Sequence, residues 1–227
     1  MKKWGLLLVA LTLALGLLLP TVAVAATPVL ADSYSETHQN DVATVYDGLT
    51  LAAGQSFTAI AGTLDSAKFY VRKHGSPTGT VRAVLYAHTG TFGDGVGTGL
   101  PLATSAPVDI ATALGTTFSL VTFNFDNTVA LSAGTKYVIG LEPGAGIQNG
   151  NDYVEIGDEH FGSHPGNEST KLADGSWFPW GDWDMCFYVY ETPPAPVSTP
   201  ASSWWSVGLL AALGLGLAVK SRRVIFS

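Results

Sequence analysis

Ala67-Lys68-Phe69-Tyr70-Val71-Arg72 is the stretch that decides the fold, because apolar side chains alternate in it with polar or amphipathic ones. This period of two predicts a β-strand with one face on a core. The turn sequence His74-Gly75-Ser76-Pro77-Thr78-Gly79 follows, in which glycine can supply a positive φ and proline fixes its own. The chain then returns as Val81-Arg82-Ala83-Val84-Leu85-Tyr86, which alternates in the same way. The pattern predicts two strands joined by a tight turn.

The remainder of the central segment predicts more short strands. Phe118–Phe125 alternates, and Lys136–Leu141 is almost wholly apolar, as a strand covered on both faces would be. Residues 27–40 are interpreted as an irregular lead-in, and residues 157–176 as a long loop. Clusters of Gly, Pro and Asn separate the strands, and helical periodicity is confined to the two termini. The sequence therefore predicts an all-β fold, a two-sheet, jelly-roll-like β-sandwich of about eight or more strands.

Residues 1–26 have the layout of a secretory signal peptide. Two lysines precede an apolar run over residues 6–19, and alanines at positions 23, 25 and 26 form an Ala-x-Ala-like cleavage site. An N-terminal membrane anchor is the alternative, but the apolar run is short for one. We expect this segment to be removed, so that the mature chain starts near Thr27.

The C-terminal segment predicts a tethering tail in three parts. Residues 192–203 are a Pro/Ser/Thr-rich spacer, which favours an extended chain. Residues 204–219 are apolar or small and predict a short transmembrane helix, and the basic residues in the tail 220–227 predict a cytoplasmic C-terminus. A buried C-terminal helix is the alternative, and it is disfavoured because the run has no polar face. The β-sandwich ectodomain is assigned to residues 27–191.

The ectodomain is acidic. Between Asp32 and Glu191 lie all 18 acidic residues and six of the 11 basic ones, a net charge of 6 − 18 = −12. Such a segment lacks the positive surface that binding to a phosphate backbone needs, so nucleic acid is not expected as a partner. Cys186, the single cysteine, lies in the apolar run 185–190 and is expected to be a buried hydrophobic residue rather than a reactive thiol.

Five short motifs occur in a fixed order along the ectodomain: Gly54-Gln55-Ser56-Phe57, Gly75-Ser76-Pro77-Thr78-Gly79, Leu85-Tyr86-Ala87-His88-Thr89-Gly90, Gly134-Thr135-Lys136-Tyr137-Val138 and Cys186-Phe187-Tyr188-Val189-Tyr190. Together they resemble the surface domains grouped as choice-of-anchor proteins, over nearly all of Asp41–Glu191. The resemblance implies a secreted, surface-attached, jelly-roll-like module without catalytic residues to assign.

The tail is similar to tripartite sorting tails of the PEP-CTERM kind. Thr199-Pro200-Ala201-Ser202-Ser203-Trp204 occupies the motif position, although Pro-Glu-Pro is absent. This similarity implies a sorting or processing protease as a partner, acting where the protein is anchored in the membrane.

Two groups of residues are candidate sites. Asp152, Glu155 and Asp158 offer hard oxygen ligands for a structural calcium ion, although they lack a calcium-loop pattern and are spread along a predicted strand. No other cofactor is predicted.

The second group is the tryptophan cluster of Trp177, Trp180 and Trp183, together with Asp182. Aromatic faces beside carboxylates suit the apolar faces and hydroxyl rims of sugars. The alternative is that the rings close the end of the sandwich, because large aromatic residues dominate cores. We expect Trp177 and Trp183 to be structural, and Trp180, between a proline and a glycine, to be exposed.

These observations predict an exported, membrane-anchored cell-surface protein that is not an enzyme but a non-catalytic adhesion or carbohydrate-binding module. Its expected partner is a cell-surface or extracellular glycan. A structural component of the envelope or extracellular matrix, without a small ligand, is the alternative. A glycan-acting enzyme comes third, since 18 acidic residues single out no catalytic pair and Gly-x-Ser-x-Gly does not occur.

Overall fold

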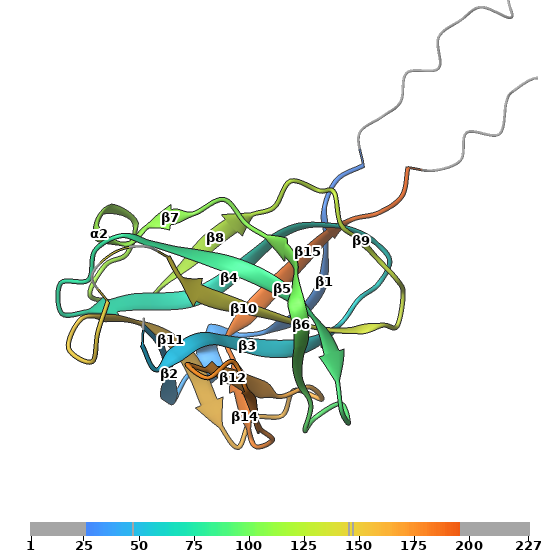
Figure 1. Cartoon of the computed structure of the whole chain (residues 1–227). Coiled ribbons are helices and arrows are strands. Elements are labelled where there is room, and N and C mark those ends of the chain that lie inside the picture. Colours follow the sequence, from blue (N-terminus) through green and yellow to red (C-terminus); the bar gives the residue numbers. More distant parts are fainter. Residues whose placement is uncertain (1–25, 47, 145, 147, 196–227) are drawn as a thin grey trace, which may run out of the picture. The chain divides into compact units, whose positions relative to one another are not determined.

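The computed structural model describes residues 26–195, except residues 47, 145 and 147, and this part of the chain forms two antiparallel sheets (Figure 1). Sheet A contains β1 (Val29–Tyr34), β2 (Asp41–Val45), β4 (Gly62–His74), β8 (Ser119–Asn124), β9 (Ala130–Leu131), β11 (Tyr153–His160), β14 (Trp183–Met185) and β15 (Phe187–Thr192). Sheet B contains β3 (Thr50–Thr58), β5 (Thr80–Thr89), β6 (Val96–Thr104), β7 (Val108–Asp109), β10 (Lys136–Pro143), β12 (Glu168–Leu172) and β13 (Trp177–Trp180). Two short helical segments complete the fold, η1 (Glu36–His38) and α2 (Ile110–Ala113).

Side chains from the facing surfaces of the two sheets form the core. Phe69 and Val71 of β4 are fully buried, as are Val81 and Leu85 of β5, and all belong to one hydrophobic cluster. Phe69 packs edge to face on Phe123 of β8, with ring centroids 6.0 Å apart. The alternation read from the sequence therefore predicts the buried face of these strands correctly, and the all-β, two-sheet prediction is confirmed.

The turn between β4 and β5 crosses from one sheet to the other. β4 pairs with β8, β9, β11 and β15, whereas β5 pairs with β6, β7 and β10. Gly75 and Gly79 have φ angles of 68° and 87°, so the turn does use glycine where the backbone is left-handed. The two strands are consequently the opposed walls of the core and not a hairpin.

β10 is the central strand of sheet B and is covered on both faces, as its apolar sequence predicts. Ile139 points into the main core, while Val138 is fully buried on the outer face. There it contacts Val84 and Tyr86, and Trp177 of the edge strand β13 packs over this second cluster. The outer face of sheet B is therefore closed by one tryptophan.

Cys186 is buried where the last strand changes partner. Its N–H donates to the carbonyl oxygen of Gly157 on β11, and its own carbonyl oxygen accepts from the N–H of Tyr70 on β4. Burial, reinforced by nearby carboxylates that include Asp158, raises the pKa of the thiol to about 12. The expectation of a buried cysteine is confirmed.

Two strands lie where the sequence was interpreted as irregular. β1 lies within the predicted lead-in, and β12 lies within the predicted loop over residues 157–176. β1 pairs with β15 and β12 pairs with β3, and in β12, which is rich in polar residues, this pairing outweighs a weak intrinsic preference for strands. β6 likewise begins inside the glycine-rich segment that follows β5.

The predicted signal peptide, apart from Ala26, and the predicted transmembrane helix and basic tail lie outside the described residues. None of the helices within residues 26–195 has the length and hydropathy that a membrane span requires. The paired strands extend from Val29 to Thr192 and so span the assigned ectodomain.

Candidate functional site

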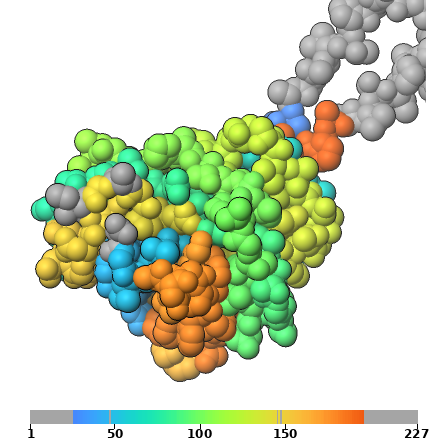
Figure 2. Space-filling view, in the orientation of Figure 1, coloured from blue at the N-terminus to red at the C-terminus, as the bar shows by residue number. Residues whose placement is uncertain are grey.

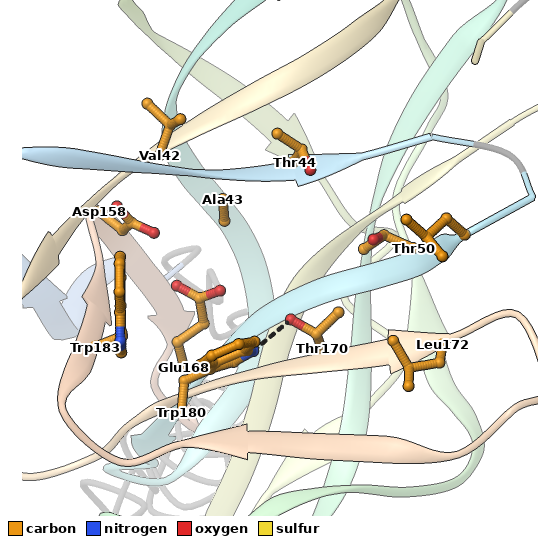
Figure 3. Close-up of a pocket in the computed structure, with 11 residues that line it drawn as sticks. Val42, Ala43, Thr44, Thr50, Asp158, Glu168, Thr170, Leu172, Trp180 and Trp183 are labelled. Carbon is orange, nitrogen blue, oxygen red and sulfur yellow. Dashed lines mark hydrogen bonds between the residues drawn. The ribbon is translucent and has the colours of Figure 1, made fainter. Parts of the chain in front are cut away.

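A pocket of about 320 Å³ opens between the two sheets at one end of the sandwich. It is lined by residues of β2 and the β2–β3 connection, of β3, and of β11 to β14 (Figure 3). In the space-filling view the surface of β12 to β14, in orange, lies beside the blue surface of β2 and β3 (Figure 2). The volume of the pocket is within the range of small-molecule binding sites, about 300–1,000 Å³.

Strand parity decides which side chains of β12 reach this pocket. Glu168, Thr170 and Leu172 point into the space between the sheets and line the pocket. Lys171 points the opposite way, where its Nζ donates to the hydroxyl of Tyr86. A short polar strand therefore carries a carboxyl group, a hydroxyl group and an apolar side chain to the pocket and keeps its cation on the outer face.

Asp158 of β11 and Glu168 of β12 face one another across the floor of the pocket, and we call them the acid pair (Figure 3). Their side chains are almost completely buried, with 1 % and 4 % of the residue surface exposed. Each carboxyl group acts on the pKa of the other, and a hydrogen bond between them would need a proton because neither ionised carboxylate can donate.

The surroundings of the acid pair oppose its ionisation. Burial raises the pKa of Asp158 to about 7, even though the interaction with Glu168 acts in the other direction. Burial also raises the pKa of Glu168 well above its usual value, and the charges of Asp158, Asp184 and Asp41 raise it further. The pair therefore keeps at least one proton up to about neutral pH.

A crossing loop, residues 161–167, joins β11 to β12 and sets the two acids opposite each other. His164 anchors it: the N–H of Gly166 donates to His164 Nδ1 over 3.0 Å, so Nε2 carries the proton and donates to Asp32 Oδ1 over 3.1 Å. The backbone N–H of His164 also donates to Asp184 Oδ2 over 2.8 Å. A Cβ atom at Gly162 would lie only 2.2 Å from that same oxygen, so the loop needs glycine there.

Asn167 fixes the other end of the crossing loop. Its side chain exchanges two hydrogen bonds with the backbone of Gly95, Nδ2 donating over 2.9 Å and Oδ1 accepting over 3.0 Å. Its backbone N–H donates to the hydroxyl of Ser56 on β3 over 2.7 Å. One buried amide therefore joins the crossing loop to β3 and to the β5–β6 turn.

Five aromatic rings follow one another beside the pocket, and we call them the aromatic strip. His160 stacks on Phe161 at 3.8 Å and on Trp183 at 4.3 Å between ring centroids. Trp183 meets Trp180 edge to face at 6.1 Å, and Trp180 meets Phe178 at 4.8 Å. Phe161, Phe178 and Trp180 are 75 %, 49 % and 41 % exposed, so the strip has an open face.

The predicted tryptophan cluster is only partly brought together. Trp180 is exposed, as expected, and Trp183 is half-buried and lines the pocket beside it. Trp177 lies on the opposite face of β13, where it packs edge to face on Tyr86 at 5.1 Å. Asp182 lies in the exposed turn before β14, and its backbone oxygen accepts from the N–H of Phe161. Trp177 and Asp182 are therefore not part of the pocket wall.

The three predicted calcium ligands do not converge. Asp152 accepts from the N–H of Ser76, and Glu155 pairs with Arg72 on the outer face of sheet A. Asp158 points the other way, into the pocket. Within the described residues, no group of three or more His, Cys, Asp or Glu side chains has the arrangement of a metal site.

Sequence reasoning missed Glu168, His160 and the exposed rings of Phe161 and Phe178. Glu168 was hidden because β12 was interpreted as loop, and its alternation of Glu, Thr and Leu is a weak strand signal. An assignment of β13 as a strand would have separated Trp177 from Trp180, since residues three apart on a strand face opposite sides.

The site is thus defined by its own geometry, as a pocket with a buried acid pair and an aromatic strip along its edge. The choice-of-anchor and PEP-CTERM resemblances continue to rest on the sequence motifs quoted above. Comparison of the amino-acid sequence with models of known protein families and with curated proteins gives no match.

Proposed function

We propose that this is an exported, membrane-anchored surface protein whose jelly-roll-like β-sandwich binds a carbohydrate chain without transforming it. The aromatic strip is the observation that carries this proposal. Three rings of the strip are exposed, and pyranose rings can stack on exposed aromatic rings; soluble proteins seldom leave such rings uncovered without a function. The pocket beside the strip gives one ring of the chain an enclosed position.

The placement of the pocket supports display at a surface. Val29 of β1 pairs with Glu191 of β15, so both ends of the sandwich strands leave at one edge. Figure 1 shows β12 and β14 at the opposite end of the sandwich. The pocket therefore lies away from the edge at which the sandwich strands begin and end.

The test of this proposal is a glycan array probed with the purified full-length chain, compared with Trp180→Ala and with Leu100→Ala. Leu100 is 84 % exposed on β6 and is neither in the strip nor in the pocket, so its variant is the matched control. Loss of one stacking ring should weaken glycan binding roughly 3- to 10-fold, while the control binds like the parent. A folded parent that binds no glycan would favour a structural envelope or matrix component instead.

Surface location has a separate test. An epitope inserted in the exposed turn at residues 132–134 should be removed when protease is added to intact cells with permeable outer layers. This turn is preferable to the one at Gly95, which Asn167 clamps. Protection of the epitope would contradict export to the surface.

A further inference from the structure

The acid pair has hydrogen-bonding capacity that the protein does not use. Asp158 Oδ1 and Glu168 Oε2 are each buried and accept no hydrogen bond from a donor group elsewhere in the described residues. Buried acceptors without a donor are costly, and most proteins provide one. Both side chains line the pocket, so a ligand placed there would lie beside these two carboxyl groups.

Among the described residues, the charged groups that act on the pKa values of the acid pair are acidic. Asp41 from β2 and Asp184 from β14 act on the pair with negative charge, and β3 contributes the neutral amide of Gln55 beside Asp184. The pocket residues of β12, β13 and β14 carry no charge besides Glu168. No lysine, arginine or histidine is among the described residues that line the pocket. His164 contacts Asp184 and Asp32, outside the pocket lining.

The walls of the same pocket favour a cation. Trp180 and Trp183 both line it, and the face of an indole ring attracts an ammonium group that lies over it. Neutral hydroxyl groups could bond the carboxyl oxygens but would leave the negative charge uncompensated. An anionic ligand would be repelled.

We infer that the sugar held in the pocket carries a protonated amine, so that the ligand is a chain containing an amino sugar. The amine donates to Asp158 and Glu168 and lies within reach of the tryptophan walls, while neighbouring sugar rings of the chain stack on the aromatic strip. This inference rests on the proposed function and names the class of ligand for that same site.

Binding of an ammonium group changes the protonation of the acid pair. Below neutral pH the pair holds a proton because the pKa values of both groups are raised, and a bound cation favours two ionised carboxylates, so this proton leaves to solvent as the ligand enters. Affinity should therefore rise between pH 5 and pH 7, and calorimetry in two buffers of different ionisation enthalpy should detect proton release at pH 6. The acidic neighbours Asp41 and Asp184 act in the same direction, since they also favour a bound cation.

The experiment uses three β-1,4-linked tetrasaccharides, which are the tetramers of glucosamine, of N-acetylglucosamine and of glucose. Isothermal titration of the full-length chain should give at least 10-fold tighter binding of the glucosamine tetramer than of the other two. Glu168→Gln should remove that preference and the proton release. Glu142→Gln is the matched control, because Glu142 is nearly buried on the outer face of sheet B, where Tyr86 and Arg82 donate to it.

The outcomes separate this inference from the proposed function. The glucose or N-acetylglucosamine tetramer could bind as tightly as the glucosamine tetramer or more tightly, with this binding lost in Trp180→Ala. That result would overturn the requirement for an amine and leave the aromatic strip as a carbohydrate-binding surface. No binding of any tetramer by the folded parent, together with a blank glycan array, would overturn both. Tighter binding of tri-lysine than of the glucosamine tetramer would assign the pocket to an amine of a protein ligand and overturn the inference of an amino sugar.

Discussion

His164 donates from Nε2 to Oδ1 of Asp32 over 3.1 Å, and this contact joins the crossing loop to the first strand of the sandwich. The second oxygen of Asp32 accepts from the N–H of Thr58 on β3 over 2.9 Å. Burial alone would raise the pKa of Asp32, but the hydrogen bonds from His164 and Thr58 outweigh it, and the pKa lies below its usual value. One carboxylate therefore links β1, β3 and the loop that positions the acid pair.

Asp32→Asn should destabilise the protein by about 2 kcal/mol at pH 7, because hydrogen bonds to a charged acceptor are lost and an amide N–H₂ would face either Thr58 N–H or His164. A lowered pKa in the folded state adds stability above the unfolded value of about 3.9, and this is lost as pH falls through the folded value. The difference between variant and parent in urea-induced unfolding should therefore shrink between pH 5 and pH 3. An equal difference at both pH values would contradict the role of the charge.

Glu168→Gln should have the opposite pH dependence. The raised pKa values of the acid pair mean that folding becomes less favourable as pH rises above the unfolded value of about 4.3. Removing one acid should therefore increase the free energy of unfolding at pH 8 and have little effect at pH 4. Glu142→Gln, which loses contacts with Tyr86 and Arg82, should gain no stability at pH 8. A loss of stability in Glu168→Gln at pH 8 would show that the pair is not strained by its charge.

Cys186 should react with an aromatic thiol reagent only after denaturation. The residue has no exposed surface, and its pKa of about 12 leaves almost no thiolate at pH 8. Labelling followed by intact-mass measurement should give an unmodified native protein and one adduct in guanidinium chloride. One equivalent of adduct formed rapidly on the native protein would contradict the burial.

Much of the fold could be predicted from the sequence because its longest strands alternate. The alternation in β4 indicates that Phe69 and Val71 lie on the face that points into the core. The apolar run of β10 indicates a strand that is covered on both faces. The partition into sheets could not be predicted, since a turn with Gly75 and Gly79 serves equally for a hairpin or for a crossing between sheets. Polar strands such as β12 form because neighbouring strands pair with them. The local amino-acid sequence does not reveal that pairing.

The candidate site could be predicted only in part from the sequence. Trp180 and Trp183 could be named from their density in the sequence, and the Pro and Gly beside Trp180 predicted its exposure correctly. The acid pair could not, because Asp158 and Glu168 belong to different sheets and meet only through the crossing loop that His164 anchors. A carboxyl group can be assigned to the interior of the sandwich only when the strand that carries it is known.

The last prediction separates the two tryptophans of β13 by the faces on which they lie. Trp177 packs on Tyr86 and covers the outer cluster of sheet B, and a Cβ atom at Gly97 would lie only 2.7 Å from its ring. Trp177→Ala should therefore cost about 2–3 kcal/mol, below the range for a fully buried tryptophan because the ring is half-buried. Trp180→Ala should cost about 1 kcal/mol or less, since this ring is exposed and bonded only through its Nε1 to Thr170.

Thermal melts and glycan binding on the same two variants give the readout. Trp177→Ala should melt several degrees lower yet bind glycan as the parent does below its melting transition, and Trp177→Phe should recover part of the lost stability. Trp180→Ala should melt close to the parent and bind glycan more weakly. The reverse pattern, with binding lost in Trp177→Ala at full stability, would place the ligand on the outer face of sheet B. Because the two residues are three positions apart on one strand, the comparison tests the face of the sheet and not merely the presence of an aromatic ring.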